Sequence, residues 1–96
     1  MPAVCRIGDR DLFHCSIPVR AEGSPNVFCN GIAISRQDDN NAPHLLPPLP
    51  CPSHAAPITL GSTTVFVNGK GCGRVGDSIT GCTAVAQGSF NVFAGG

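Results

Sequence analysis

Apolar residues in this chain stand in short groups, and Gly, Ser, Asn or Pro separates each group from the next. An amphipathic helix would instead repeat its apolar positions about every 3.6 residues, and that periodicity is absent from the sequence. Gly and Pro also interrupt most windows that are long enough for a helix. The pattern therefore predicts an all-β protein of short strands and turns with almost no helix.

One element of the pattern occurs three times with the template GSxxVFx(N/G)G. Each copy contains a Gly-Ser turn, a short Val-Phe strand, and then Asn-Gly or Gly-Gly, which are dipeptides that accept positive φ in tight hairpin turns. The sequence therefore predicts three short strands, each ending in a turn. The copies are residues 23–31, 61–69 and 88–96.

A second element reads Arg-x-(Gly/Asp)-Asp and also occurs three times, at Arg6–Asp9, Arg36–Asp39 and Arg74–Asp77. The latter two copies follow a GSxxVF element at the same offset, whereas the first copy and the last GSxxVF each stand alone. One unit is thus split between the two ends of the chain. We expect the final strand to pair beside the first in a compact, pseudo-three-fold β structure. In the turns we expect a structural role, in which Asp accepts backbone N–H groups.

Length and charge narrow the class of protein. The 96 residues suffice for a single small domain, 1–96, with a proline-rich insertion at 42–57. Six Lys and Arg balance six Asp and Glu, so no basic field is available for nucleic acid or anionic lipid. The start of the chain lacks the apolar core of a signal peptide, and Pro and His break the longest uncharged stretch. We expect no nucleic acid partner, no stable membrane insertion and no Sec-dependent secretion.

Six cysteines would indicate a disulfide framework in a secreted chain of this length. No export signal supports that interpretation, and no CxxC pair is present for a zinc ribbon or a redox site. Cys5 and Cys29 lie in strand-like apolar runs, where a free cysteine behaves as a small buried residue. Most of the cysteines are therefore expected to fill the core.

The repeat also places metal-ligand residue types at equivalent positions. Five residues beyond the Asp of each second element stand His14, His44 and Cys82. Equivalent positions of three related units converge on their common axis, so these side chains are expected to meet there. Two imidazoles and a thiolate suit a tetrahedral zinc ion, or iron, that needs a fourth ligand. His54 lies in the proline-rich insertion, which is expected to form an extended, stiff loop, and it is the expected fourth ligand.

Two further cysteines compete for the thiolate position. Cys51 precedes His54 by three residues and can replace Cys82 as the ligand. Cys15 adjoins His14, but neighbours in a strand point to opposite faces, which favours packing for Cys15. The sequence leaves the choice between Cys82 and Cys51 open, and the choice between zinc and iron as well.

Catalytic machinery is hard to assemble from this sequence. It contains no GxSxG, no phosphate loop and no paired carboxylates with a base. A catalytic zinc keeps an open position beside a carboxylate, and the nearby candidates are Asp11, Asp38 and Asp39. Four protein ligands would close such a site. We therefore expect no catalytic residues and no enzymatic activity.

The segment from Gly61 to Asp77, GSTTVFVNGKGCGRVGD, resembles the repeat of PAAR-repeat proteins, a family named for a Pro-Ala-Ala-Arg segment. The similarity extends over essentially the whole chain through residues 6–14, 23–39 and 88–96. The naming tetrad reads GCGR at 71–74 and AISR at 33–36, so only its Arg is kept, and Asp38 stands where Gly is usual.

The resemblance implies a small conical β structure that caps the blunt end of a trimeric β-helical spike, in contractile phage tails or in type VI secretion systems. In that family three His and one Cys hold a metal near the point, which carries over here to His14, His44, His54 and Cys82. Apolar strand ends would form the base, and a monomer would sit on the trimer. The partner would be a phage central spike or a protein of the valine-glycine repeat protein G type.

These implications give the expected function, a non-enzymatic membrane-piercing spike tip in which a structural metal, Zn2+ or Fe, stiffens the cone. It would carry no toxin extension and would pierce the target cell envelope transiently. Its location would be the tail spike of a virion, or the bacterial cytoplasm before delivery. The alternative is a free-standing metal-binding adaptor or metal-storage module, which would exchange its metal readily. A small metallo-hydrolase would need an open coordination position.

Overall fold

The computed structural model describes residues 1–12, 18–42, 44–46, 51–81 and 83–95, with 44–46 and 51–54 described by their backbone. These residues contain no helix and form three two-stranded antiparallel sheets, which confirms the all-β class. The strands are β1 (Phe28–Cys29), β2 (Ile32–Ala33), β3 (His44–Leu46), β4 (Cys51–His54), β5 (Phe66–Val67) and β6 (Lys70–Gly71).

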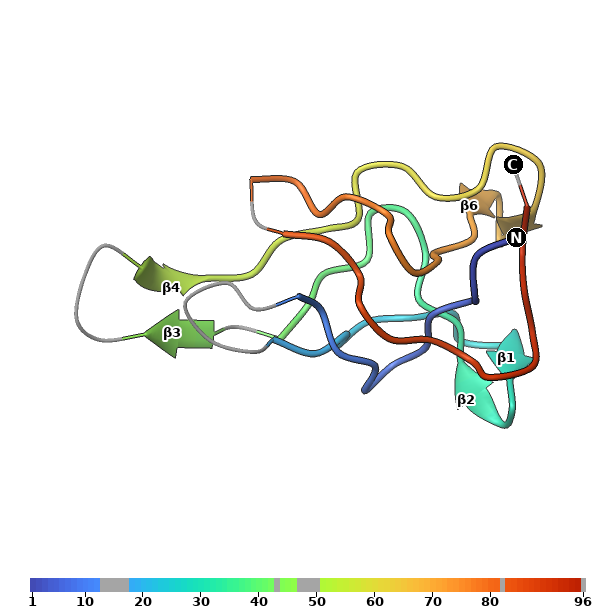
Figure 1. Ribbon diagram of the computed structural model, residues 1–96, viewed down its shortest axis with the longest axis horizontal. Coiled ribbons are helices and arrows are strands. Elements are labelled where there is room, and N and C mark those ends of the chain that lie inside the picture. The colour runs from blue at the N-terminus through green and yellow to red at the C-terminus, as the bar shows by residue number, and fades with distance from the viewer. Residues whose placement is uncertain (13–17, 43, 47–50, 82, 96) are drawn as a thin grey trace.

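The molecule is elongated, with extents of 39 × 23 × 21 Å. The β3–β4 hairpin lies at its narrow end, whereas β1, β2, β6 and both termini lie at the opposite, broad end (Figure 1). The broad end, formed by β1, β2, β5, β6 and residues 2–4 and 92–94, is called the base below. The taper agrees with the conical shape that the resemblance to PAAR-repeat proteins implies.

Two copies of the GSxxVF element form hairpins at the base. β1 pairs with β2, and β5 pairs with β6 in the equivalent register. The connecting residues Asn30 and Gly31 have φ of 54° and 77°, and Asn68 and Gly69 have φ of 54° and 78°. Positive φ at both central positions is typical of a type I′ turn, whose twist matches that of the strands it joins. The turns predicted at these two copies are confirmed.

The third copy closes the molecule by pairing with the start of the chain. Phe93 forms an antiparallel bridge with Ala3. Two backbone hydrogen bonds support this bridge, from Val4 N to Val92 O and from Ala94 N to Pro2 O, both at 3.0 Å. The split unit therefore assembles as the repeat predicts. The equivalent pairs in the other units are Phe28 with Ala33 and Phe66 with Gly71.

Backbone hydrogen bonds join the three units in a closed ring around the pseudo-three-fold axis. Cys5 N donates to Gly73 O at 3.0 Å, Gly73 N to Ser35 O at 3.0 Å, and Ser35 N to Cys5 O at 3.1 Å. A Cβ atom at Gly73 would lie 2.5 Å from Ser35 O and 2.7 Å from Cys5 Sγ. Only glycine therefore fits the third position of the ring.

The apolar core near the base is built from two repeat positions, and every unit contributes one residue to each. The first position follows the exposed Phe of the strand, because alternation along a strand turns neighbouring side chains to opposite faces. The second position precedes the residue of the backbone ring. Burial of each aliphatic side chain stabilises the fold by about 1.5–3 kcal/mol. The residues are Cys29, Val67 and Ala94 at the first position, and Val4, Ile34 and Cys72 at the second.

The proline-rich insertion differs from the extended loop that its composition suggests, because β3 and β4 pair as an antiparallel hairpin. Pro52 lies inside β4 although it has no N–H to donate to a ladder. In a two-stranded sheet each strand is an edge with one unpaired side, where proline is tolerated. The extended backbone that proline favours is therefore compatible with a strand here, and β3 and β4 lie at the narrow end (Figure 1).

Candidate functional site

The β3–β4 hairpin brings two of the predicted metal ligands together. His44 stands directly opposite His54 in the ladder. Residues directly opposite in an antiparallel pair share a face of the sheet and are near neighbours, which suits two ligands of one ion. The sequence marked both histidines as ligands but did not show that they are cross-strand partners, because their pairing depends on the register of the hairpin.

The other two predicted ligands, His14 and Cys82, lie outside the described residues, as does the competitor Cys15. Cys51 stands opposite Leu46 in the ladder. Within the part of the chain that the structure describes, no group of three or more His, Cys, Asp or Glu side chains is placed to hold a metal ion. The predicted set extends beyond those residues, so the four-ligand site stays a prediction.

The donor set itself fits a closed structural site. Three neutral imidazoles and one thiolate are the nitrogen and sulfur ligands that tetrahedral zinc takes, and iron accepts them as well. The cross-strand pair of His44 and His54 supplies the one juxtaposition of two ligands that the structure describes.

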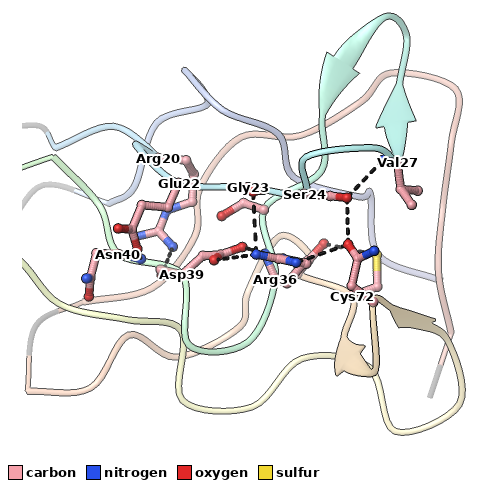
Figure 2. Close-up of polar contacts among 12 residues, drawn as sticks. Arg20, Glu22, Gly23, Ser24, Val27, Arg36, Asp39, Asn40 and Cys72 are labelled. Carbon is pink, nitrogen blue, oxygen red and sulfur yellow. Dashed lines mark hydrogen bonds and ion pairs between the residues drawn. The ribbon is translucent and has the colours of Figure 1, made fainter.

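An Arg–Asp clamp of the same geometry occurs in each unit. Arg36 Nε donates to Asp39 Oδ2 at 2.8 Å and Arg36 Nη2 donates to Asp39 Oδ1 at 3.0 Å (Figure 2). The backbone N of Arg36 also donates to Asp39 Oδ2 at 2.8 Å, which confirms the expected role of Asp in the turn. Bidentate pairs of this kind are strong and directional. The equivalent clamps join Arg6 to Asp9 and Arg74 to Asp77.

The arginines of the clamps keep their charge over the whole physiological range. The hydrogen bond with Asp39 raises the pKa of Arg36 above its usual value. Asp9 has the same effect on the pKa of Arg6, and Asp77 on that of Arg74. Only 11% of the Arg36 side chain and 6% of the Asp39 side chain are exposed, so solvent screens this pair weakly.

Each clamp also reaches the next unit, at a hairpin turn in two cases and at the equivalent residue Gly95 in the third. Arg36 Nη1 donates to Asn68 Oδ1 at 3.0 Å, and Ser24 Oγ donates to the same oxygen at 2.6 Å. Ser24 Oγ in turn accepts from Val27 N at 2.8 Å (Figure 2). The three units are therefore linked in a ring of side-chain hydrogen bonds. In the other two links, Arg6 and Ser89 converge on Asn30 Oδ1, and Arg74 and Ser62 converge on the backbone oxygen of Gly95.

Three equivalent phenylalanines are exposed at the base and are called the base triad below. Phe28, Phe66 and Phe93 expose 57%, 61% and 51% of their surface. Val65 and Val92, one residue earlier in two of the copies, are also exposed. Exposed apolar groups that recur in this way are typical of a protein interaction surface. The base thus presents an apolar surface with the pseudo-three-fold pattern of the fold.

The three cysteines whose side chains the structure describes fill the core rather than forming a reactive site. Cys5, Cys29 and Cys72 are free and buried, as the sequence predicts for the first two. Burial raises the pKa of Cys72 to about 11 and also raises the pKa of Cys5. Both groups are therefore neutral thiols at physiological pH and are poor ligands and nucleophiles.

The carboxylates that could have served as catalytic bases have structural partners. Asp39 belongs to a clamp. Asp11 forms an ion pair with Arg20 at 3.1 Å, and both side chains have 0% exposure. Asp38 lies in a turn with φ of 72°, where the other two units have Gly8 and Gly76. Asp11 and Asp39 are thus committed to ion pairs within the fold.

The buried pair of Asp11 and Arg20 is a feature that the sequence reasoning missed. The sequence did contain a signal for this pair, at the repeat position two residues beyond the Asp of each clamp. Two units have a polar residue there, Asp11 and Asn41, whereas the third has Ile79. A polar residue at a repeat position that is elsewhere apolar indicates a buried polar contact, since all three positions are buried.

The fold and these contacts define a class, a small pseudo-three-fold β protein stabilised by repeated Arg–Asp clamps and exposing an apolar base. Residues 50–96 match the PAAR motif family. The match supports a PAAR-repeat protein, and the PAAR motif is associated with the spike-tip proteins of contractile injection systems. No curated protein matches the chain. Over the residues that the structure describes, none of the elements is a helix long and apolar enough to span a membrane.

Proposed function

We propose that this protein is the non-enzymatic tip of a membrane-piercing spike and caps a trimeric β-helical spike protein of a contractile injection apparatus. The base triad carries the proposal, because Phe28, Phe66 and Phe93 are each more than half exposed and recur with the pseudo-three-fold pattern. A single chain with three equivalent apolar contacts matches the three-fold axis of a trimer, with one contact for each subunit. The match of residues 50–96 to the PAAR motif family supports the same role.

The partner would be a phage central spike or a protein of the valine-glycine repeat protein G type, with one copy of this chain on each trimer. The protein would act at the tail spike of a virion, or wait in the bacterial cytoplasm before delivery. It would pierce the envelope of the target cell transiently, without stable insertion and without contact to nucleic acid.

A membrane-piercing tip must be rigid, and the contacts along the cone favour a rigid molecule. The closed backbone ring through Cys5, Ser35 and Gly73 ties every unit to the other two, and so do the hydrogen bonds from the three clamp arginines to the next unit. At the narrow end we propose a structural metal ion, Zn2+ or Fe, held by His14, His44, His54 and Cys82. When bound, such an ion would cross-link the segments that carry its ligands, and its binding energy would add to the stability of the fold.

Binding to a trimeric β-helix fragment of a spike protein tests the docking role. The wild type is expected to form a complex of one chain with one trimer at micromolar concentration. The triple variant Phe28→Ser, Phe66→Ser and Phe93→Ser is expected to bind at least about 100-fold more weakly, because it loses three aromatic anchors. Failure of the wild type to bind, or equal binding by the triple variant, would remove the proposal.

Leu60→Ser provides the matched control for docking. Leu60 is 54% exposed, within the range of the base triad. In the repeat it corresponds to Glu22 and Gln87, whose side chains accept from Asn40 N and Arg10 N, away from the base hairpins. The control is therefore expected to bind the trimer like the wild type.

Elemental analysis of the purified protein tests the metal site. We expect one zinc or iron per chain. Cys82→Ser is expected to lower both the metal content and the midpoint temperature of unfolding, and Cys51→Ser to change them much less. The opposite order of the two variants would assign the thiolate to Cys51, and a metal-free wild type would exclude the site.

A further inference from the structure

Six repeat-equivalent residues form a buried layer between the clamps and the narrow end. Two positions of each unit contribute, and antiparallel bridges connect them from unit to unit around the axis. Each of the six residues exposes 3% or less of its surface. The residues are Asp11, Asn41 and Ile79 at the first position, and Arg20, Ile58 and Val85 at the second.

One side of the layer is polar and the other is apolar. Arg20 bridges to Asn41 and Ile58 bridges to Ile79, so the same backbone pairing carries two different chemistries. The apolar side shows that this architecture packs well with aliphatic residues alone. Burial of an ion pair costs desolvation energy that aliphatic residues do not incur. Filling the core therefore does not explain why residues on this side of the layer are polar.

Arg20 holds two units together on the polar side. Its Nη2 donates to Asp11 Oδ2 at 3.1 Å, and its Nη1 donates to the backbone oxygen of Asp39 at 3.2 Å (Figure 2 shows the latter contact). Asn41 Nδ2 donates to the same oxygen of Asp11 at 3.2 Å. The carboxylate of Asp11 thus accepts hydrogen bonds from two donors that lie in different segments.

Asn41 extends these contacts to the insertion. Its Oδ1 accepts from the backbone N of Ala56 at 2.9 Å. The cluster therefore joins three segments, and each of them carries a predicted histidine ligand close by in sequence. Asp11 precedes His14 by three residues, Asn41 precedes His44 by three, and Ala56 follows His54 by two. The unit that carries Cys82 contributes Ile79 and Val85, the aliphatic part of the layer.

We infer that Asp11, Arg20 and Asn41 are positioning residues that fix the roots of the three histidine-bearing segments and so preorganise the metal site. The inference rests on the metal site proposed above. Hydrogen bonds are directional, so they fix segment positions more tightly than aliphatic contacts do. A ligand set drawn from separate segments gains affinity when those segments are already in place.

Zinc release to a metallochromic chelator tests this inference on the full-length, zinc-loaded protein. The triple variant Asp11→Ile, Arg20→Val and Asn41→Ile copies the apolar side of the layer. It is expected to retain the urea midpoint of the metal-free protein, because the replacement residues suit the layer. Its zinc release is expected to be about 10–100-fold faster than that of the wild type.

Asn41→Leu is a second variant, which keeps the Arg20–Asp11 pair. It tests the positioning role even if the triple variant does not fold. It is expected to release zinc about tenfold faster. Ile79→Val is the control, because it loosens the same layer without removing a hydrogen bond, and its release rate is expected to match that of the wild type.

The outcomes separate this inference from the metal site on which it rests. Release rates of the polar variants equal to that of the wild type would overturn the positioning role while leaving the metal site intact. A rate for Asn41→Leu no faster than that for Ile79→Val would overturn it as well. A wild type that holds no zinc or iron would remove the metal site, and the positioning role with it.

Discussion

The backbone N–H of Cys5 donates to the carbonyl oxygen of Gly73 at 3.0 Å, so segments far apart in the sequence meet on the pseudo-three-fold axis. The contact closes a ring in which each unit donates to one neighbour and accepts from the other. Because a ring of this kind has no free end, no unit can shift along the axis without breaking hydrogen bonds to both of its neighbours. A fold closed in this way suits the piercing role proposed above.

Gly73→Ala is expected to destabilise the protein by about 2–3 kcal/mol, because overpacking a close-packed core is costly. The added Cβ would lie 2.5 Å from Ser35 O and would push the ring apart. Urea denaturation monitored by circular dichroism measures the change. Gly95→Ala is the control, since the nearest atom to its added Cβ is Met1 Sδ at 3.6 Å, and a change within about 0.5 kcal/mol is expected there. Equal stability of the two variants would contradict the packing of the ring.

Arg36→Lys is expected to cost about 1–2 kcal/mol, although it keeps the charge. An ammonium group cannot reproduce the fork that contacts both oxygens of Asp39, nor reach Asn68 in the same geometry. Chemical denaturation at neutral pH gives the value. Arg10→Lys, at an exposed position, is expected to change stability by less than about 0.5 kcal/mol. If Arg36→Lys proves equally neutral, the clamps act through charge alone and not through bidentate geometry.

Asp38→Gly is expected to stabilise the protein. Asp38 has φ of 72°, a left-handed conformation that glycine adopts without the penalty of a Cβ. The equivalent residues Gly8 and Gly76 have φ of 90° and 92°. A gain of about 0.5–1 kcal/mol corresponds to a rise of about 2–8 °C in the midpoint of thermal unfolding. The reciprocal change Gly76→Asp is expected to lower the midpoint, and a fall with Asp38→Gly would show that the side chain outweighs the strain.

Alkaline pH is expected to weaken the fold through its buried thiols. Burial raises the pKa of Cys72 from 9.0 to about 11, so the unfolded state loses its proton at a lower pH than the folded state does. The stability that this group contributes is complete below pH 9 and is lost as the pH rises towards 11. One such group changes stability by up to about 1.4 kcal/mol per pH unit in that window.

Cys72→Val isolates the contribution of that thiol. Valine suits the site because Val4 and Ile34 occupy the equivalent positions. Urea midpoints between pH 8 and 11 are expected to fall less steeply for the variant than for the wild type. Parallel curves would show that Cys72 does not control the alkaline response.

Regular, local features of the fold could be predicted from the sequence. The Asn30-Gly31 and Asn68-Gly69 dipeptides predicted tight turns because positive φ depends on the residues in the turn itself. The Arg-x-(Gly/Asp)-Asp element predicted a turn held by Asp, for the same local reason. The offset of the repeat also predicted that the strand around Phe93 pairs with the start of the chain.

Contacts between non-equivalent residues could not be predicted in this way. The proline-rich insertion looked like an extended loop, since the pairing of β3 with β4 depends on a register that proline content does not encode. The clamp of Arg36 reaches Asn68 only because the next unit places its turn there. For the metal site, the sequence named the four candidate ligands, and the structure added that His44 and His54 are cross-strand partners.

The sequence by itself determined the repeat, and with it the number of units, their turns and the chemistry of their equivalent positions. Those properties follow from residues near one another in the chain, where conformational preference acts directly. The tertiary structure alone decided how the repeat is broken, with Asp11, Arg20 and Asn41 forming a buried polar contact opposite aliphatic residues of the same layer. A buried charge is stable only beside partners that satisfy it, and the packing of distant segments decides which partners it meets.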